Sequence, residues 1–179
     1  MKKSSWDRLI LGLALAVLTL GASSCGYTLV GSGNYLPAGI KTIQIPTFIN
    51  KTTRVELEQR VTQAVADEMV SRSGRHLVAN EKNADAILRG TIESFGITPI
   101  AFNDQGRATR YQVTVIAKIE LVDHRHDDKP IWKNDHYNFT ANYAIDISSG
   151  DSFDQETRAI QEIAQQFAES VVSSLLEGF

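Results

Sequence analysis

Two histidines and three aspartates form the closest approach to a metal-binding group in this sequence. His124 and His126 are two residues apart, with Asp123, Asp127 and Asp128 beside them. A structural zinc site needs four ligands at characteristic spacings, and no further ligand follows at such a spacing. We therefore interpret these residues as a solvated, charged hairpin loop, with metal binding as the alternative.

Other chemistry lacks a local signature. We find no nucleophile with its base, no carboxylate pair and no glycine-rich phosphate loop after a strand. The sequence therefore predicts a protein that is not an enzyme and that holds no cofactor. An envelope hydrolase remains a weaker alternative, because it would need catalytic groups that only the fold brings together.

The single cysteine, Cys25, has a chemical role that its surroundings suggest. Basic residues come first, an apolar run occupies residues 9–20, and the small residues Ser23 and Ser24 precede the cysteine. This order is typical of a secretory signal, and the run is too short to span a bilayer, which takes about twenty residues. The pattern resembles the bacterial lipobox, although Ala22 stands where Leu is more usual. We predict lipidation of Cys25; an ordinary signal with an incidental cysteine is the alternative.

Lipidation would tether the chain to a membrane. One acyl chain holds a protein only marginally, whereas the diacylglyceryl group and amide-linked chain of bacterial lipoproteins would suffice. Resemblance to such lipoproteins implies the outer membrane, because Gly26 follows the cysteine where Asp would favour retention in the inner membrane. We expect a signal peptide at 1–24, a lipid-anchored tether at 25–39 and one domain at 40–179.

The composition of the expected mature chain limits its partners. Residues 25–179 are enough for one domain with one core, and they carry 20 Asp and Glu against 15 Lys and Arg. This acidic balance argues against general nucleic-acid binding, which needs a basic surface. Without a second cysteine, stability must come from packing alone.

The elements that would position these groups follow from periodicity. We expect strands at 40–46, 86–102, 110–121 and 134–145, and a turn at 103–106. One helix should begin at a capping box, Thr53-x-x-Glu56, and end near Gly74. Ser152-x-x-Gln155 should cap a second helix that ends at Gly178. The order β-α-β-β-β-α predicts an α+β two-layer sandwich of about four mixed strands with two helices on one face.

The other face of this sheet should be uncovered and polar. We interpret this face as solvated. The alternative is that it contacts a polar partner, such as sugar or the interior of a water-filled barrel. Its expected members are Arg89, Glu93, Arg110, Gln112, Thr114, Lys118, Glu120, Asn134, Asn138, Thr140 and Asn142.

Short motifs spread along the chain resemble those of one family. In order they are Cys25-Gly26-Tyr27, Leu36-Pro37, Ile43-Gln44-Ile45-Pro46-x-Phe48, Asn50-x-Thr52, Leu57-Glu58, Ala84-Asp85-Ala86-Ile87-Leu88-x-Gly90, Tyr111-Gln112-Val113, Ile131-Trp132 and Phe153-Asp154. Together they resemble the lipopolysaccharide-assembly lipoproteins called LptE. The resemblance implies an outer-membrane lipoprotein that plugs the β-barrel protein LptD and helps pass lipopolysaccharide to the cell surface.

The resemblance also implies basic residues that contact the phosphorylated sugar of the lipid. The candidates here are Arg107 and Arg110 beside the 103–106 turn, with Lys118 as a weaker one. Arg can bind phosphate through two parallel hydrogen bonds, which suits this role. The alternative is that both arginines are solvated or pair with Asp104. The acidic stretch 146–154 departs from the expected pattern for lipid contact.

A different class of envelope protein shares part of the pattern. Residues 43–48, the first helix and residues 84–88 also resemble periplasmic domains of TolB-type and curli-secretion lipoproteins. That resemblance would imply protein or peptide partners, or assembly into a ring.

Overall fold

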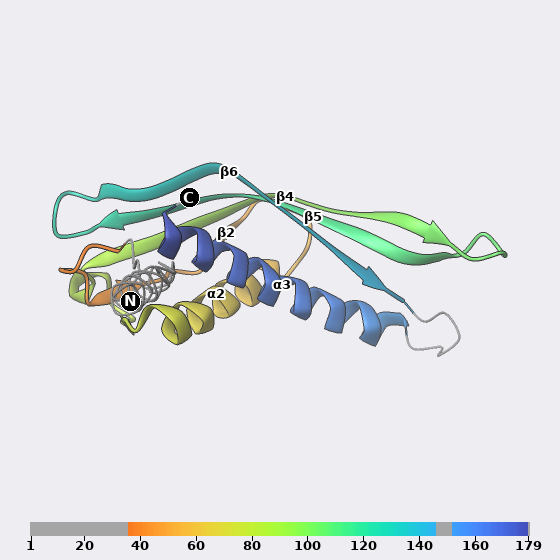
Figure 1. Cartoon of the computed structure of the whole chain (residues 1–179), viewed down its shortest axis with the longest axis horizontal. Coiled ribbons are helices and arrows are strands. Elements are labelled where there is room, and N and C mark those ends of the chain that lie inside the picture. Colours follow the sequence, from red (N-terminus) through yellow and green to blue (C-terminus); the bar gives the residue numbers. More distant parts are fainter. Residues whose placement is uncertain (1–35, 146–151, 179) are drawn as a thin grey trace, which may run out of the picture. The chain divides into compact units, whose positions relative to one another are not determined.

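The computed structural model describes residues 36–145 and 152–178, so Cys25, the signal region and most of the tether lie outside the described residues. No helix within these ranges has the length and apolarity needed to cross a membrane. The elements, labelled as in Figure 1, are β1 (Thr42–Gln44), β2 (Ile49–Asn50), α2 (Leu57–Ser73), β3 (His76–Leu77), the 3₁₀ helix η2 (Glu81–Asn83), β4 (Ala86–Phe102), β5 (Ala108–Asp123), β6 (Lys129–Ala144) and α3 (Ser152–Glu177).

The strands form one mixed sheet in the order β3-β1-β4-β5-β6, with β2 also paired to β4. The pairs among β1, β2, β3 and β4 are parallel, whereas β4, β5 and β6 are antiparallel. The α+β class is confirmed, but the prediction of four strands is wrong. β2 and β3 have only two residues each, too few to show an alternating pattern. The first strand is also shorter than 40–46, because a turn bonds the Ile40 amide to the Pro37 carbonyl.

Both helices lie on one face of the sheet, as predicted (Figure 1). Their apolar stripes and the inward residues of the strands form one main core. Phe167 of α3 is fully buried at its centre and meets Tyr137 and Phe139 of β6 edge-on, at ring-centroid distances of 5.7 and 5.6 Å. Leu36 also joins this core, although it belongs to the predicted tether.

The ends of α2 show one confirmed and one wrong prediction. Gly74 ends the helix in the left-handed region, at φ 64°, as expected. The capping box is wrong: Glu56 is itself left-handed, at φ 64°, and no side-chain cap bonds the helix start. Asn50 instead organises the approach, because its amide donates to the Arg54 carbonyl and to the Glu58 carboxylate, both at 2.7 Å. Gly178 follows α3 with φ 79°, whereas the side chain of Ser152, the predicted cap, is outside the part that the structure describes.

The three long strands follow the predicted alternation, interrupted by three shifts of register between β4 and β5 and two between β5 and β6. A bulge between Ile92 and Ser94 moves the inward positions of β4 to Phe95 and Ile97. A second irregularity, opposite residues 117–119 of β5, places Asn134 opposite the buried Ile119. Paired residues share a face of the sheet, so the prediction that Asn134 lies on the polar face is wrong.

Two motif residues hold the parallel part of the sheet together. The Asp85 carboxylate accepts the amides of Lys41 and Thr42 at 2.8 and 2.9 Å, which joins β1 to the start of β4. These amides lower the pKa of Asp85, with Lys41 making the largest contribution. Gly90 lies against the buried Phe48 ring, and a Cβ there would come within 2.3 Å of it. The motifs 43–48 and 84–90 therefore describe one packed unit.

Candidate functional site

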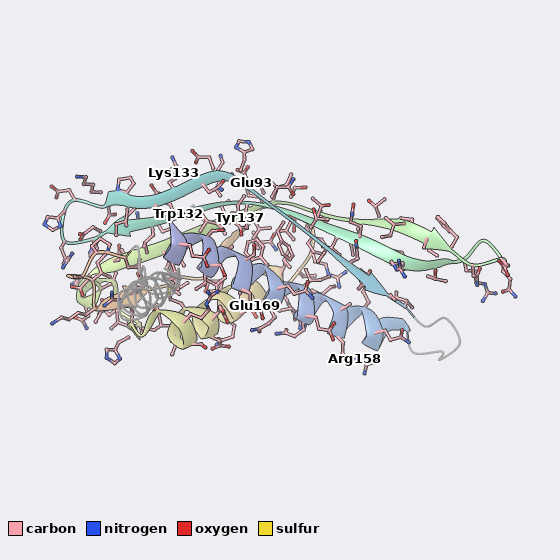
Figure 2. All side chains as sticks on the ribbon, in the orientation of Figure 1. Glu93, Trp132, Lys133, Tyr137, Arg158 and Glu169 are labelled. Atoms are coloured by element: carbon pink, nitrogen blue, oxygen red, sulfur yellow. The ribbon has the colours of Figure 1, made fainter. Side chains whose placement is uncertain are left out.

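We call the outer face the sheet surface opposite the helices, and divide it into two halves. The proximal half comprises Arg89, Glu93, Lys118, Glu120 and Lys133. The distal half comprises Arg110, Gln112, Thr114, Asn138, Thr140 and Asn142. Figure 2 shows Glu93 and Lys133 on the side away from the helices, and Trp132 and Tyr137 toward them.

Each cation of the proximal half has a carboxylate partner. The Arg89 guanidinium lies 2.6 Å from the Asp128 carboxylate, and the Lys118 ammonium 3.1 Å from that of Glu93. Lys118 is the main cause of a lowered pKa at Glu93. Lys133 pairs with Asp135 at 3.2 Å. These cations already have anionic partners, so an incoming phosphate would compete with a carboxylate for each of them.

A hollow of about 420 Å³ opens on the proximal half, walled on one side by Pro46, Thr47 and Ile49. Its floor carries cations and anions together, including Lys118, Glu120 and Lys133. This mixed lining suits water or a neutral polar group better than an anion.

The two histidines of the β5–β6 turn each face an aspartate. His124 lies 2.8 Å from Asp128, and His126 lies 3.0 Å from Asp123. The neighbouring Arg125 also bonds Asp123 and strongly lowers its pKa. Within the described ranges, no three His, Cys, Asp or Glu side chains are grouped to hold a metal ion. The geometry is that of an ion-paired turn.

The β4–β5 turn carries Arg107, and Arg110 follows it near the start of β5. Asn103 organises the turn, since its side-chain oxygen accepts the amides of Gln105 and Arg107 and Gly106 adopts φ 73°. The side chains of Arg107 and Arg110 are exposed and make no ion pair or hydrogen bond with any described residue. The alternative of pairing with Asp104 is therefore not seen, and the two guanidinium groups are available to an anion.

The structure does not bring Lys118 to these arginines. Arg110 lies opposite Ala101 and Lys118 opposite Thr91. Eight residues of extended strand separate them, roughly 25 Å. The predicted candidates thus divide into an unpaired pair at the turn and a paired lysine in the proximal half, while Cys25 lies outside the described residues.

The sequence did not lead us to predict exposed apolar side chains near the same turn. Ile100 and Phe102 are 43% and 60% exposed, and the inward-facing Tyr111 and Tyr143 stack with ring centroids 5.4 Å apart. Burial raises the pKa of Tyr143. The mostly apolar stretch from Ile97 to Phe102 could have indicated these groups. A strand pattern, however, does not distinguish a covered apolar residue from an exposed one.

The distal half is otherwise neutral. Gln112 lies opposite Asn142, Thr114 opposite Thr140 and Ile116 opposite Asn138. Apart from Arg110, this stretch offers amide and hydroxyl groups without formal charge. It can hydrogen-bond sugar hydroxyls, water or polar protein groups with little electrostatic selection.

This two-layer α+β domain is similar to solved structures of bacterial proteins. One is the solution structure of the uncharacterized lipoprotein B of Nitrosomonas europaea, with 10% identity, a TM-score of 0.55 and coverage of 84% of this chain and 90% of that one. Another is the hypothetical protein CT253 of Chlamydia trachomatis, with 10% identity, a TM-score of 0.53 and coverage of 78% and 97%. At such identities the likeness concerns the fold alone.

The family follows from the sequence of the domain. The model of the lipopolysaccharide-assembly family LptE matches residues 40–175, and the chain belongs to this family. Among curated proteins, none is significantly similar to the chain in sequence. The family resemblance seen in the motifs is therefore confirmed.

Proposed function

We propose that this chain is a non-enzymatic lipoprotein of the outer membrane, anchored through Cys25, that plugs the LptD β-barrel and assists transport of lipopolysaccharide to the cell surface. Membership of the lipopolysaccharide-assembly family supports the process. The barrel partner, the anchor and the lipid contacts are the parts that we infer.

The observation that carries the proposal is the distal half of the outer face. Both helices cover the opposite side of the sheet (Figure 1), so this surface is left to another molecule or to water. Its exposed residues include Asn138, Thr140 and Asn142, which are polar but uncharged. Large barrels have polar interiors, so a plug needs a surface that loses little when water is replaced by polar protein groups.

Contact with lipopolysaccharide would fall to the β4–β5 turn. Arg107 and Arg110 are exposed and unpaired within the described residues, and a guanidinium can bind phosphate through two charge-assisted hydrogen bonds. The exposed side chains of Ile100 and Phe102 lie on the same hairpin. An anionic sugar head with attached acyl chains offers partners for both kinds of group. Lys118 is a weaker contact because Glu93 already pairs with it.

The test is recovery of the native, acylated protein from outer membranes through a C-terminal affinity tag. We expect one large barrel protein to co-purify, and the N-terminal peptide of the mature chain to carry acyl groups on Cys25. Recovery of the protein alone, with an unmodified thiol, would contradict the proposal. A homogeneous ring of this chain would instead support the TolB-type or curli-secretion alternative.

A further inference from the structure

β6 forms the edge of the sheet, and part of its backbone has no hydrogen-bond partner among the described residues. The Ile145 amide bonds to the Thr109 carbonyl at 3.1 Å, in the same register as Ala144 opposite Arg110. In an antiparallel ladder, alternate residues bond to the partner strand and the residues between them point away. Asn138, Thr140, Asn142 and Ala144 therefore direct their N–H and C=O groups away from β5. Within the described ranges, no hydrogen bond satisfies the outward amides of Asn138, Thr140 and Asn142.

The two halves of this edge are protected differently. Residues 129–136 contain Pro130, Lys133, Asp135 and a register shift, all of which discourage strand addition. Residues 137–144, Tyr-Asn-Phe-Thr-Ala-Asn-Tyr-Ala, contain no proline and no charge, and their register with β5 is continuous. The features that protect an edge strand from strand addition therefore end at His136.

We propose that residues 137–144 of β6 accept an extended, uncharged segment of the barrel partner as an additional strand of the sheet. This inference rests on the proposed function and specifies how the partner binds. Main-chain hydrogen bonds to the outward groups of Asn138, Thr140 and Asn142 would supply the affinity. Strands in the wall of a closed barrel are already paired on both edges, so the added segment is a loop or terminal stretch within the lumen.

The side chains of β6 define the chemistry of that segment. Asn138, Thr140 and Asn142 lie on the outer face, while Phe139, Ala141 and Tyr143 face the core side. An added strand continues both rows, so its side chains alternate between neutral polar and apolar. A charged residue in the apolar row would lie beside Phe139 and Tyr143 without a charged partner, which is unfavourable.

A second copy of the chain fits this edge less well. Pairing of two β6 edges about Thr140 would also bring two α3 helices together. Glu162 and Glu169 are exposed on α3, and Figure 2 shows Glu169 on the helix. Two copies of these acidic side chains would then lie at the same interface, and like charges there disfavour the dimer.

The test compares Thr140→Pro with Thr140→Ala in the full-length, acylated protein. Proline removes the outward amide at position 140 without removing a hydrogen bond to β5, and edge strands tolerate it. Alanine removes the same side chain but keeps the amide, so it is the matched control. We expect capture of the barrel to fall about tenfold or more for Thr140→Pro relative to Thr140→Ala, because the partner strand is left with an unsatisfied carbonyl.

A second measurement needs no variant. Hydrogen–deuterium exchange of residues 137–144 in the wild-type complex should slow at least about tenfold relative to the free protein. Equal capture by the two variants, or unchanged exchange on complex formation, would overturn the added strand while leaving the proposed function intact. Wild-type protein that captures no barrel would overturn the proposed function, and this inference with it. A self-associated protein whose dimer is lost in Thr140→Pro would identify a second copy as the occupant and also overturn the proposal.

Discussion

The proximal and distal halves of the outer face differ in how they satisfy their polar groups. In the proximal half, Arg89 and Lys118 have carboxylate partners within 2.6 and 3.1 Å. In the distal half and at the adjoining turn, Arg107 and Arg110 have no partner among the described residues. The cations of the proximal half are therefore already paired, whereas the distal half and the turn retain donors for another molecule. Substitutions should affect stability in the first and binding in the second.

The largest difference is expected between a phenylalanine of the core, under the sheet, and one beside the β4–β5 turn. Phe167→Ala removes a fully buried ring that packs on Tyr137 and Phe139, and should lower the free energy of unfolding by about 3–5 kcal/mol. Phe102→Ala at the β4–β5 turn removes a ring that is 60% exposed, and should change it by less than about 0.5 kcal/mol. Urea denaturation followed by circular dichroism measures both. Similar losses of unfolding free energy for the two variants would show that the turn contributes to stability as much as the core does.

Glycines of β4 provide a finer comparison. Gly90→Ala places a Cβ 2.3 Å from the Phe48 ring, whereas Gly96→Ala has no heavy atom within 4 Å of the new carbon. Because the buried ring must move, we expect Gly90→Ala to cost about 1–3 kcal/mol of unfolding free energy. Gly96→Ala should be neutral within about 0.5 kcal/mol. A neutral result at Gly90 in the same denaturation experiment would show that Phe48 has free space into which it can move.

The Asp85 link between β1 and β4 predicts a pH dependence. Its folded-state pKa lies below the ordinary value of 3.8 because it accepts the amides of Lys41 and Thr42. The ionised group therefore stabilises the fold above pH 3.8, and this contribution disappears as pH falls through the lower folded pKa. Asp85→Asn should lose about 1 kcal/mol at pH 7, since a charge-assisted bond becomes a neutral one. Urea midpoints across pH 7 to 2.5 should converge at the acidic end; a constant gap would exclude this origin.

Much of the fold could be predicted from sequence because its long elements repeat their patterns many times. β5 alternates from Tyr111 to Leu121, and α3 presents a regular apolar stripe from Ile160 to Leu175. The two-residue strands β2 and β3 carry no such repetition; main-chain bonds to β4 and β1, such as those from Lys51 to Ile92 and from His76 to Lys41, define them. At Glu56 the local pattern predicted a capping box that does not form. Hydrogen bonds of Asn50 to Arg54 and Glu58 organise the start of the helix instead.

The candidate site was less predictable than the fold. The family resemblance and charge suggested Arg107 and Arg110, with Lys118 as a weaker candidate, but the partners of each cation depend on strand register. Glu93 meets Lys118 because Thr91 lies opposite Lys118 across β4 and β5. Register also decides which amides of β6 point outward, and the sequence of residues 137–144 does not contain that information.

The last prediction concerns the affinity for lipid at the turn and not the stability of the fold. Replacing both Arg107 and Arg110 by Glu should weaken binding to lipopolysaccharide about five- to tenfold, because two exposed phosphate contacts become repulsive. The unfolding midpoint should stay unchanged, since neither side chain has a partner in the described part of the domain. Fluorescence titration with purified lipopolysaccharide at fixed ionic strength would measure the affinity.

A matched control separates position from net charge. Lys82→Glu with Arg158→Glu makes the same change in charge at two exposed sites on η2 and α3, and should alter the affinity less than twofold. Lys118→Gln should also have little effect on lipid binding, because Glu93 already occupies that ammonium group. If the control pair weakens binding as much as the turn pair does, the lipid responds to overall charge rather than to the turn. If Lys118→Gln weakens lipid binding more than either double variant does, the phosphate binds in the proximal half. Lys118 must then release the Glu93 carboxylate to bind the phosphate.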